Sequence, residues 1–325
     1  MAGEPYDFLV IIPTYRRPKF LLEAIESSLS QQGASKVVIV VDDCPDGSAE
    51  ATVAGIGNRA AIYLRNPNRS RGGPAPVRNA GFRRAQELGI AAAYVHFLDD
   101  DDETPPGYYA DAKAAFAAHP QRGVVFGTLN AFSHLSDDPE KRARQEAHLR
   151  AEQANFLQLA RTVRIYRALG EGLGLPALTQ WLFAEHALYG HPLFFCGCSL
   201  IRHELVGILG GFPEDIRLTE DLRFFGEAVR RFGAHFIDRT AVNYRMSDRS
   251  LTRSQDIPVV DREAEIAEVT ATLRQWQSEL KDRLGTAKFY PAKAAYRALI
   301  RPLVERVILP LQDVMGSPTS RWSRS

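Results

Sequence analysis

The sequence has 325 residues, enough to bury a substantial core as one large domain or two smaller ones. Forty Lys and Arg stand against 39 Asp and Glu, and a formal net charge of +1 gives no argument for nucleic-acid binding. The three cysteines, Cys44, Cys196 and Cys198, are too few for a disulfide framework and lack the spacing of a zinc site, so we expect a reducing compartment.

The N-terminal stretch MAGEPYDFLVIIPTY has no basic region of the kind found in signal peptides, and its apolar run is too short for one. No segment approaches the roughly 20 apolar residues of a transmembrane helix. These two observations predict a cytoplasmic protein.

Short apolar runs alternate with helical patterns through the N-terminal part of the chain. Strands are predicted over residues 8–12, 36–41, 60–65 and 92–98, and helices over residues 17–33, 49–57 and 76–89. Each strand is apolar throughout, which is typical of a parallel sheet covered by helices on both faces. Ligands bind outside the carboxyl ends of such strands, where the sequence places Thr14, Asp42, Asp43 and Asp99 to Asp102.

The composition then changes. Residues 137–190 are charged and helical in period, which indicates a helical insertion rather than a separate domain. Strand, turn and short-helix signals return over residues 191–212. A helix over 219–233 follows, with Thr219 as its N-cap, and then a strand over 234–246.

From residue 259 the pattern is helical again. Within this part, residues 288–311 carry an apolar stripe beside Lys293, Arg297 and Arg301, which predicts a basic amphipathic helix interrupted by prolines. Such a helix either packs against the core or a second copy of the chain, as a homodimer, or makes a peripheral contact with the inner face of a membrane.

Four consecutive aspartates, Asp99 to Asp102, follow the fourth predicted strand. Two carboxylates about 5 Å apart repel by roughly 3 kcal/mol at an effective dielectric constant near 20, so a fold that gathers them needs a compensating cation. One interpretation is a solvated turn. The other is a metal site, because hard oxygen ligands favour Mg²⁺ or Mn²⁺, which use one or two carboxylates together with substrate phosphates.

Three further features each have a structural and a functional interpretation. The pair Asp42-Asp43 either forms an Asx turn or accepts hydrogen bonds from a nucleoside. The stretch 68–82 is either a plain loop before a helix or an anion site built from backbone amides and arginine. The pair Glu220-Asp221 either complements a helix dipole or carries chemistry.

Six blocks of sequence occur in order: VIIPTYRRPKFLLEAIESSLSQ, VIVVDDCPDGS, GGPAPVRNAGFRRA, FLDDDDETPPGYY, GCSLIRHELVGILGGFPED and TEDLRFFGEAVRRFG. Together they resemble the family 2 glycosyltransferases, a large inverting group with the GT-A fold, over residues 7–255 with the insertion excluded. The resemblance implies an α/β protein whose mostly parallel, Rossmann-like central sheet is flanked by helices, with a helical insertion and a helical C-terminal extension.

The resemblance assigns residues to a nucleotide-sugar site. The donor would contact Pro13, Thr14, Tyr15, Asp42, Asp43, Arg78, Asp99 and Asp100. A Mn²⁺ or Mg²⁺ ion bridging the diphosphate would be held by the two aspartates that match the family's DxD motif and by the acid after them, namely Asp99, Asp101 and Asp102.

The resemblance also assigns the acceptor side. Asp221 matches the aspartate of the family's ED motif, the expected general base, with Glu220 beside it as a second catalytic residue. Its place at the start of a helix would favour the ionised form. Residues 210–212 would lie near the acceptor. The sequence departs from the family pattern at residues 44–46, which lengthen the second block, and at Ser247, where many members have a histidine.

The implied GT-A domain covers residues 1–258, and a C-terminal helical extension covers 259–325. Within the domain, residues 1–128 would bind the nucleotide sugar, 129–195 would form the helical insertion and 196–258 would face the acceptor. The implied function is inverting, metal-dependent transfer from a UDP-, GDP- or dTDP-sugar to a sugar or glycoconjugate acceptor in polysaccharide or glycoconjugate synthesis. The alternatives are a non-catalytic nucleotide-sugar-binding subunit and a nucleotidyltransferase, although the latter would normally carry glycines where this chain has PTYRRPKF.

Overall fold

The computed structural model describes residues 5–66, 73–188, 193–216, 218–246, 262–285 and 298. The chain forms two compact units. The first comprises the residues up to Asn130 together with Phe194–Arg245, and the second comprises Ala131–Leu193 and the described residues from Met246 onward. Ser247 and, apart from Ala298, the predicted amphipathic helix over 288–311 lie outside the described residues.

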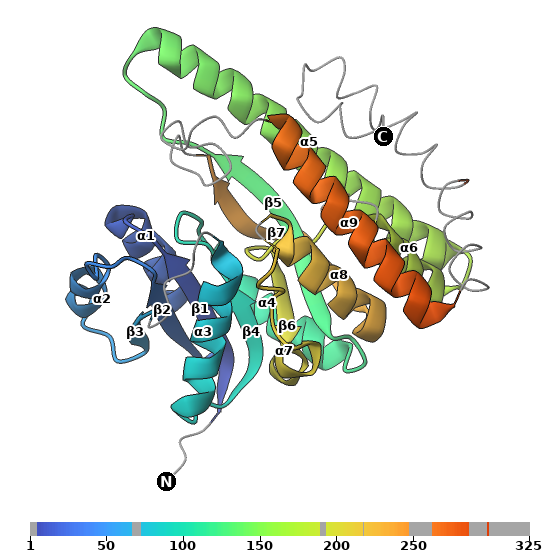
Figure 1. The fold of residues 1–325 in the computed structure, drawn as a ribbon, viewed down its shortest axis with the longest axis horizontal. Helices are drawn as coiled ribbons and strands as arrows, with labels where there is room; N and C mark the ends of the chain where they lie inside the picture. Colours follow the sequence, from blue (N-terminus) through green and yellow to red (C-terminus); the bar gives the residue numbers. More distant parts are fainter. Residues whose placement is uncertain are drawn as a thin grey trace. The chain divides into compact units, whose positions relative to one another are not determined.

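The first unit is built on a sheet of seven strands (Figure 1). The strands are β1 (Tyr6–Thr14), β2 (Lys36–Asp42), β3 (Ala61–Arg65), β4 (Ala92–Phe97), β5 (Val124–Phe132), β6 (Ser199–Arg202) and β7 (Ala234–Arg245). The helices of this unit are α1 (Pro18–Leu29), α2 (Glu50–Ile56), α3 (Pro74–Glu87), α4 (Tyr108–Ala118), α7 (His203–Leu209) and α8 (Glu220–Phe232).

The strands are ordered β3-β2-β1-β4-β6-β5-β7. β1 pairs in parallel with β2 and β4, and β2 with β3, whereas β6 runs antiparallel to both of its neighbours. This arrangement confirms the predicted α/β fold with a mostly parallel sheet flanked by helices. Because β1, β2 and β4 are parallel, their carboxyl ends meet at one edge of the sheet, where ligands bind in folds of this kind.

Alternate residues of β1 face opposite sides of the sheet, and helices cover both sides. Phe8, Val10 and Ile12 belong to one hydrophobic core with buried residues of α1, α2 and α4. On the other side α3 lies across β1 and β2 (Figure 1). A Cβ atom added to Gly81 of α3 would meet Ile11 Cγ2 at 2.6 Å, so the absence of a side chain there sets the close approach of α3.

The described part of the second unit is mainly helical. It contains α5 (Pro139–Gly172), α6 (Pro176–Leu188) and α9 (Arg262–Leu284), and α6 packs against both of the others. Asp138 caps α5 by accepting a hydrogen bond from the Lys141 N–H at 2.8 Å. The Tyr166 hydroxyl is hydrogen-bonded to Nδ1 of His186 at 2.8 Å, which ties α5 to α6. Among the described helices, none combines the length and the apolar character needed to cross a membrane.

The sequence patterns predicted neither α4 nor β5. The four buried residues of α4 lie on one side of the helix, but alanines on its other sides hide this apolar stripe in the sequence. In β5, Gly127 interrupts the apolar run. The structure gives the reason for this glycine, because a Cβ atom there would lie 2.7 Å from the carbonyl oxygen of Arg239 in β7.

Candidate active site

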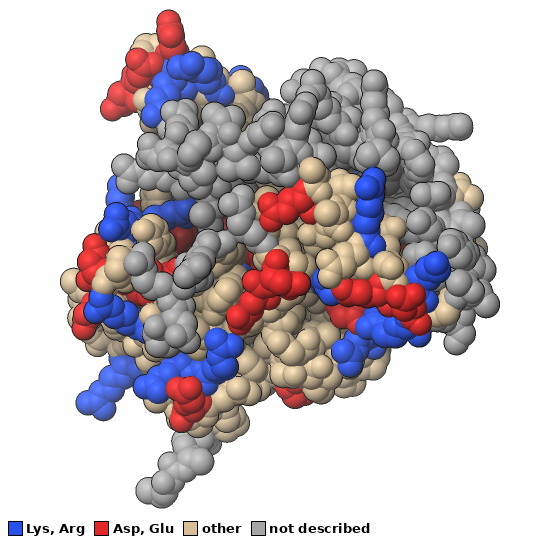
Figure 2. Space-filling view, viewed as in Figure 1, with Lys and Arg blue, Asp and Glu red and all other residues tan. Residues whose placement is uncertain are grey.

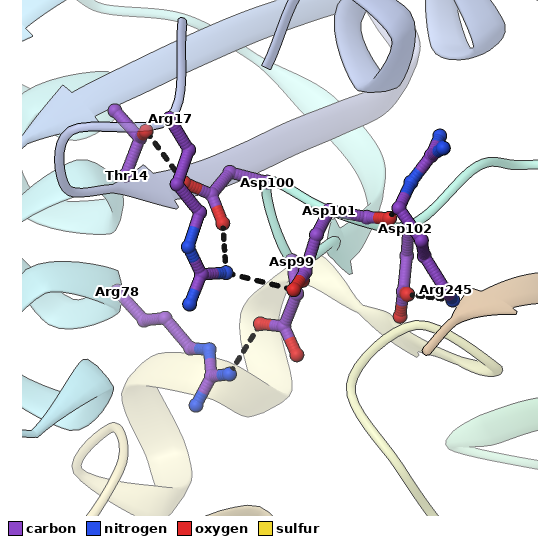
Figure 3. A network of polar contacts seen from close by, with 8 residues as sticks. All are labelled: Thr14, Arg17, Arg78, Asp99, Asp100, Asp101, Asp102 and Arg245. Carbon is purple, nitrogen blue, oxygen red and sulfur yellow. Dashed lines mark hydrogen bonds and ion pairs between the residues drawn. The ribbon is translucent and has the colours of Figure 1, made fainter. Parts of the chain in front are cut away.

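The predicted polar residues meet at the carboxyl edge of the sheet (Figure 3). Thr14 ends β1, the aspartates 99–102 follow β4, and Arg78 lies in the second turn of α3. Glu220 and Asp221 begin α8, and Glu220 reaches Arg78. Four segments that are far apart in the sequence therefore contribute to one polar cluster.

Asp100 and Asp101 share one arginine, Arg17, which immediately precedes α1 (Figure 3). Nη1 of Arg17 donates hydrogen bonds to Asp100 Oδ1 at 3.0 Å and to Asp101 Oδ2 at 2.7 Å, and the Arg17 side chain is only 15% exposed. The Thr14 hydroxyl donates to Asp100 Oδ2 at 2.6 Å. Both carboxylate oxygens of Asp100 are therefore engaged inside the protein.

Arg78 links the aspartates to α8. Its two terminal nitrogens donate to Asp99 Oδ1 at 2.7 Å and to Glu220 Oε1 at 2.6 Å, and the guanidinium lies 5.3 Å from the centre of the Phe212 ring. The Arg78 side chain is buried, whereas 40% of the Asp99 side chain is exposed. Asp99 is thus the carboxylate of the cluster that a ligand entering from solvent would meet first.

Arg245, the last residue of β7, holds the other end of the aspartate loop. Its backbone N–H donates to Asp102 Oδ1 at 2.9 Å, and its Nε donates to the carbonyl oxygen of Asp101 at 2.8 Å. Its guanidinium also pairs with Glu23 at 2.6 Å and with Glu103 at 2.5 Å. Asp102 is buried, so its carboxylate fixes the loop from the inside.

Burial raises the pKa of these carboxyl groups, because the charged form loses its water. The pKa of Asp100 rises to about 7 through burial, against the opposing effect of Arg17. Burial likewise raises the pKa of Asp101, and it raises that of Asp102 well above its usual range, with Asp101 adding to the effect. In this structure, arginine side chains supply the positive charge that the sequence led us to expect beside the cluster.

Glu220 and Asp221 follow a strained residue. Thr219 occupies the predicted N-cap position of α8, but its φ of +66° lies in the left-handed region and its side chain makes no capping hydrogen bond. Burial raises the pKa of Glu220 to about 7, and it also raises the pKa of Asp221, whose Oδ1 accepts a hydrogen bond from the Leu222 N–H at 2.7 Å. Burial therefore outweighs the helix dipole that we expected to favour the ionised form, and Asp221 is a stronger base than an exposed aspartate.

Asp42 is engaged within the loop after β2. Its Oδ1 accepts from the Cys44 N–H at 2.9 Å, and its Oδ2 accepts from the Ala49 N–H at 2.8 Å and from the Tyr63 hydroxyl at 3.3 Å. The side chain is fully buried. The Asx-turn interpretation describes this residue, and its carboxylate shapes the loop that carries Asp43.

Asp43, Tyr15 and Pro13 are more accessible. Asp43 is half-buried and accepts a hydrogen bond from Asn66 Nδ2 at 2.7 Å, while its N–H donates to the carbonyl oxygen of Thr14 at 3.0 Å. Tyr15 is exposed and Pro13 is half-buried. These residues lie on two adjacent strand ends. Residues 67–72 of the predicted anion loop lie outside the described residues.

Within the described ranges, no three His, Cys, Asp or Glu side chains are grouped so that they could hold a metal ion. The donor chemistry nevertheless suits a hard divalent cation. Asp99 contacts Arg78 through Oδ1 and Asp101 contacts Arg17 through Oδ2, which leaves the second oxygen of each carboxylate outside these contacts. One or two protein carboxylates are sufficient for Mg²⁺ when a diphosphate supplies further ligands.

The sequence did not predict the roles of Arg17 and Arg245 in the site. Arg17 lies 83 residues from Asp100, and Arg245 lies 143 residues from Asp102, so no local pattern joins these partners. Cys196 is buried, and burial raises the pKa of its thiol well above the usual range, although Arg78 nearby opposes the rise. Charge balance could have pointed to Arg17, because a buried row of carboxylates requires nearby cations and Arg16 and Arg17 follow β1 after a single tyrosine.

Comparison with known proteins identifies the family of this chain. The model of glycosyl transferase family 2 matches residues 9–174, a little over half of the chain. The succinoglycan biosynthesis protein ExoO of Rhizobium meliloti is 36% identical over 101 residues, 31% of this chain and 27% of its own length. The colanic acid biosynthesis glycosyl transferase WcaA of Escherichia coli, described as putative, is 30% identical over 128 residues, 39% of this chain and 42% of its own length. The chain therefore matches less than half of the length of either relative.

The fold has a counterpart among solved structures. The crystal structure of residues 1–349 of S. aureus TarS in complex with UDP-GlcNAc superposes with a TM-score of 0.58 at 17% identity, covering 94% of this chain and 77% of that one. At this identity the likeness supports the fold alone. The match of the family model confirms the family predicted from the six sequence blocks. The chain belongs to glycosyl transferase family 2.

Proposed function

We propose that the protein is an inverting, metal-dependent glycosyltransferase that moves a sugar from a nucleotide-diphosphate sugar to an acceptor hydroxyl group. One observation carries the proposal. At the carboxyl edge of the sheet, the partly exposed Asp99 is joined through Arg78 to Glu220, next to the raised-pKa carboxyl group of Asp221. In this arrangement a charged diphosphate bound near Asp99 would lie beside a group that can accept a proton.

On the donor side, Asp43 and Tyr15 are the accessible residues of the two strand ends and would face the nucleoside. Asp99 and Asp101 would hold the divalent cation, which supplies positive charge against the negative charge that develops on the leaving diphosphate. Arg17 and Arg78 already contact these two carboxylates. They would therefore stay beside the diphosphate and add to its stabilisation.

On the acceptor side, Asp221 would take the proton from the attacking hydroxyl group. Burial raises its pKa, which increases its basicity while a carboxylate is still available at neutral pH. Glu220 is held by Arg78 and would orient the start of α8 rather than accept the proton. A single displacement on the face opposite the diphosphate requires no enzyme nucleophile and inverts the anomeric configuration.

The relatives suggest which substrates to test first. TarS was solved in complex with UDP-GlcNAc, and two relatives are named for succinoglycan and colanic acid biosynthesis. A UDP-sugar donor and a saccharide or glycoconjugate acceptor in polysaccharide synthesis are therefore our first candidates. GDP- and dTDP-sugars complete the donor panel.

The test is a thermal-shift panel of nucleotide sugars with and without Mn²⁺, followed by turnover of the best donor. We expect stabilisation by one donor class only when Mn²⁺ is present, and an NMR spectrum of the product with the anomeric configuration opposite to that of the donor. Binding without any transfer or hydrolysis would favour a non-catalytic subunit. Retention of configuration would contradict the single displacement.

A further inference from the structure

Half of the large apolar side chains that are exposed in the described part of the chain lie within one short stretch. These are Leu157, Ile165, Leu169, Leu173 and Leu175, which are between 38% and 62% exposed. They occupy the C-terminal half of α5 and the turn before α6. Single exposed apolar residues are normal on a protein surface, but a concentration of them marks an interaction site.

The exposed residues share one side of α5. At 3.6 residues per turn, Leu157, Ile165 and Leu169 fall within an arc of about 120° on the helix. The opposite side of the same stretch is buried, at Phe156, Ala160, Val163, Tyr166 and Gly170. This stretch of α5 therefore carries large apolar side chains on its solvent side as well as on its core side, whereas the solvent side of a surface helix is ordinarily polar.

The exposed arc is also basic. Arg161 is exposed within it, Arg164 is exposed about 20° beyond its edge, and residues 153–170 contain no Asp or Glu. The acidic residues of α5 are Glu140, Glu146, Glu152 and Glu171, all outside this stretch. Figure 2 shows Lys or Arg side chains mixed with Asp or Glu at the N-terminal end of α5, and Glu171 at the other end pairs with Arg167 at 3.4 Å. An apolar stripe with arginines and without acids is typical of helices that lie on anionic lipid.

We propose that the exposed side of residues 157–175, here called the α5 stripe, docks on an anionic membrane surface with the helix lying in the plane of the interface. A second copy of the chain is a poorer occupant, because pairing two α5 stripes would bring arginines together without an acidic partner within residues 153–170. Insertion across the membrane is not part of the proposal. The apolar side chains would enter the headgroup region while the guanidinium groups contact lipid phosphates.

The test uses the full chain and flotation with vesicles of phosphatidylcholine, with and without phosphatidylglycerol. We expect binding only to the anionic vesicles, and we expect it to weaken as salt is raised. Replacing Leu169 and Leu173 together by Glu should lower the vesicle partition coefficient at least tenfold. The matched control replaces Leu88 and Ile208, two exposed apolar residues of the first unit, by Glu and should bind as the wild type does.

A second pair of variants tests the charge. Arg161→Gln should lower partition into anionic vesicles by roughly fivefold, since one arginine near such a surface contributes about 1 kcal/mol. Arg59→Gln, an exposed arginine of the first unit, is its control. Far-ultraviolet circular dichroism confirms folding, and Leu169→Ser replaces the Glu pair if that variant does not fold.

Three results would overturn the proposal. The first is that the wild type does not bind anionic vesicles. The second is binding that persists in all α5 stripe variants, which would assign the membrane contact to another segment such as 288–311. The third is a wild-type dimer that the Leu169 and Leu173 substitutions convert to a monomer without a change in vesicle binding, which would make a second copy the occupant.

Discussion

At the scale of single residues, arginines control the charge of the aspartate cluster. Arg17 bridges Asp100 and Asp101, and Arg78 bridges Asp99 and Glu220. Each arginine is mostly buried and each contacts two carboxylates, so neither pair is a surface ion pair of negligible energy. Removing one of these arginines leaves two carboxylates without their main counter-charge, which makes its role measurable.

Arg17→Gln should destabilise the protein by about 3 kcal/mol or more, the typical cost of removing one partner of a buried pair. Mn²⁺ should then stabilise the variant more than the wild type, because the released carboxylates of Asp100 and Asp101 would gain a replacement cation. The measurement is thermal unfolding with and without MnCl₂. Arg16→Gln is the control, since that side chain is 59% exposed and lies 3.8 Å from Asp46. An equal Mn²⁺ effect in the variant and the wild type would contradict this account.

Asp221→Asn should lower kcat by about 10²- to 10⁴-fold, the usual contribution of a general base, while the affinity for the donor changes little. Burial raises the pKa of Asp221, so kcat of the wild type should rise with pH through a pKa above the ordinary aspartate value of 3.8. Steady-state kinetics with the identified acceptor measure both quantities. Asp215→Asn, at an exposed position of the same unit, should leave kcat unchanged. Near wild-type turnover of Asp221→Asn would move the search for the base to Asp102, and a loss of kcat in Asp215→Asn would point to Asp215 instead.

Titration of His96 should make the free energy of unfolding depend on pH. His96 is buried in β4, and because the Gly197 carbonyl can only accept, Nε2 donates to it at 2.9 Å while Nδ1 accepts from the Tyr109 hydroxyl at 2.8 Å. Burial lowers the pKa of His96 from 6.5 to about 4. Between these values the unfolded chain binds a proton that the folded protein does not, so this contribution to stability is present above pH 6.5 and is lost as the pH falls toward 4.

The size of this effect is about 3 kcal/mol in total. The raised pKa of Asp100 and Glu220, about 7 in each case, acts in the opposite direction, because the folded protein then binds protons more readily as the pH falls. The test is therefore urea unfolding of the wild type and of His96→Gln at pH 7 and at pH 4.5. The loss of unfolding free energy between the two pH values is compared between the two proteins. The wild type should lose more stability than the variant on acidification. Parallel losses would show that His96 does not titrate as described.

At the scale of elements, the sequence predicted the helices and strands in which the apolar residues form a continuous run or recur at helical spacing. The apolar runs of β1, β2 and β4 and the stripe of α8 follow directly from residue spacing. α4 and β5 were missed because alanines blur the helical stripe and a glycine required by close packing resembles a break. The residues of the site could be predicted only from their position at strand ends and from the sequence motifs. Its ion pairs were not, since they join residues 21 to 222 positions apart, with no local pattern between the partners.

The close approach of α3 to the sheet depends on Gly81. A Cβ atom there would meet Ile11 Cγ2 at 2.6 Å and Val41 Cγ2 at 2.8 Å, so the helix or the strands must shift. Gly81→Ala should destabilise the protein by about 1 to 3 kcal/mol through overpacking. Gly55→Ala is the matched control, because no atom lies within 4 Å of the added Cβ and alanine favours the helix by up to about 1 kcal/mol. Chemical denaturation compares the two, and equal stabilities would exclude the packing argument.

At the scale of the whole molecule, the two compact units can be observed separately. All three tryptophans lie outside the first unit: Trp181 is in α6, Trp276 is in α9, and Trp322 lies beyond the described residues. Tryptophan fluorescence therefore follows the second unit, whereas calorimetry follows both. The proposed nucleotide site is built entirely from residues of the first unit, so ligand binding and tryptophan emission report on different parts of the chain.

UDP with Mn²⁺ should stabilise the first unit selectively. A ligand whose concentration is a hundred times its Kd raises the free energy of unfolding of the part that binds it by about 2.7 kcal/mol. For a unit of this size each kcal/mol corresponds to about 2–4 °C, so the calorimetric transition of the first unit should rise by about 5–10 °C. The unfolding midpoint seen by tryptophan fluorescence should stay within a degree or so, because the second unit gains no ligand.

UDP with EDTA is the control and should shift neither unfolding signal, since the diphosphate alone would face the unscreened charge of Asp99. A fluorescence midpoint that rises together with the calorimetric one would mean that the two units unfold as a single cooperative body, and a full shift in EDTA would remove the metal from the donor site.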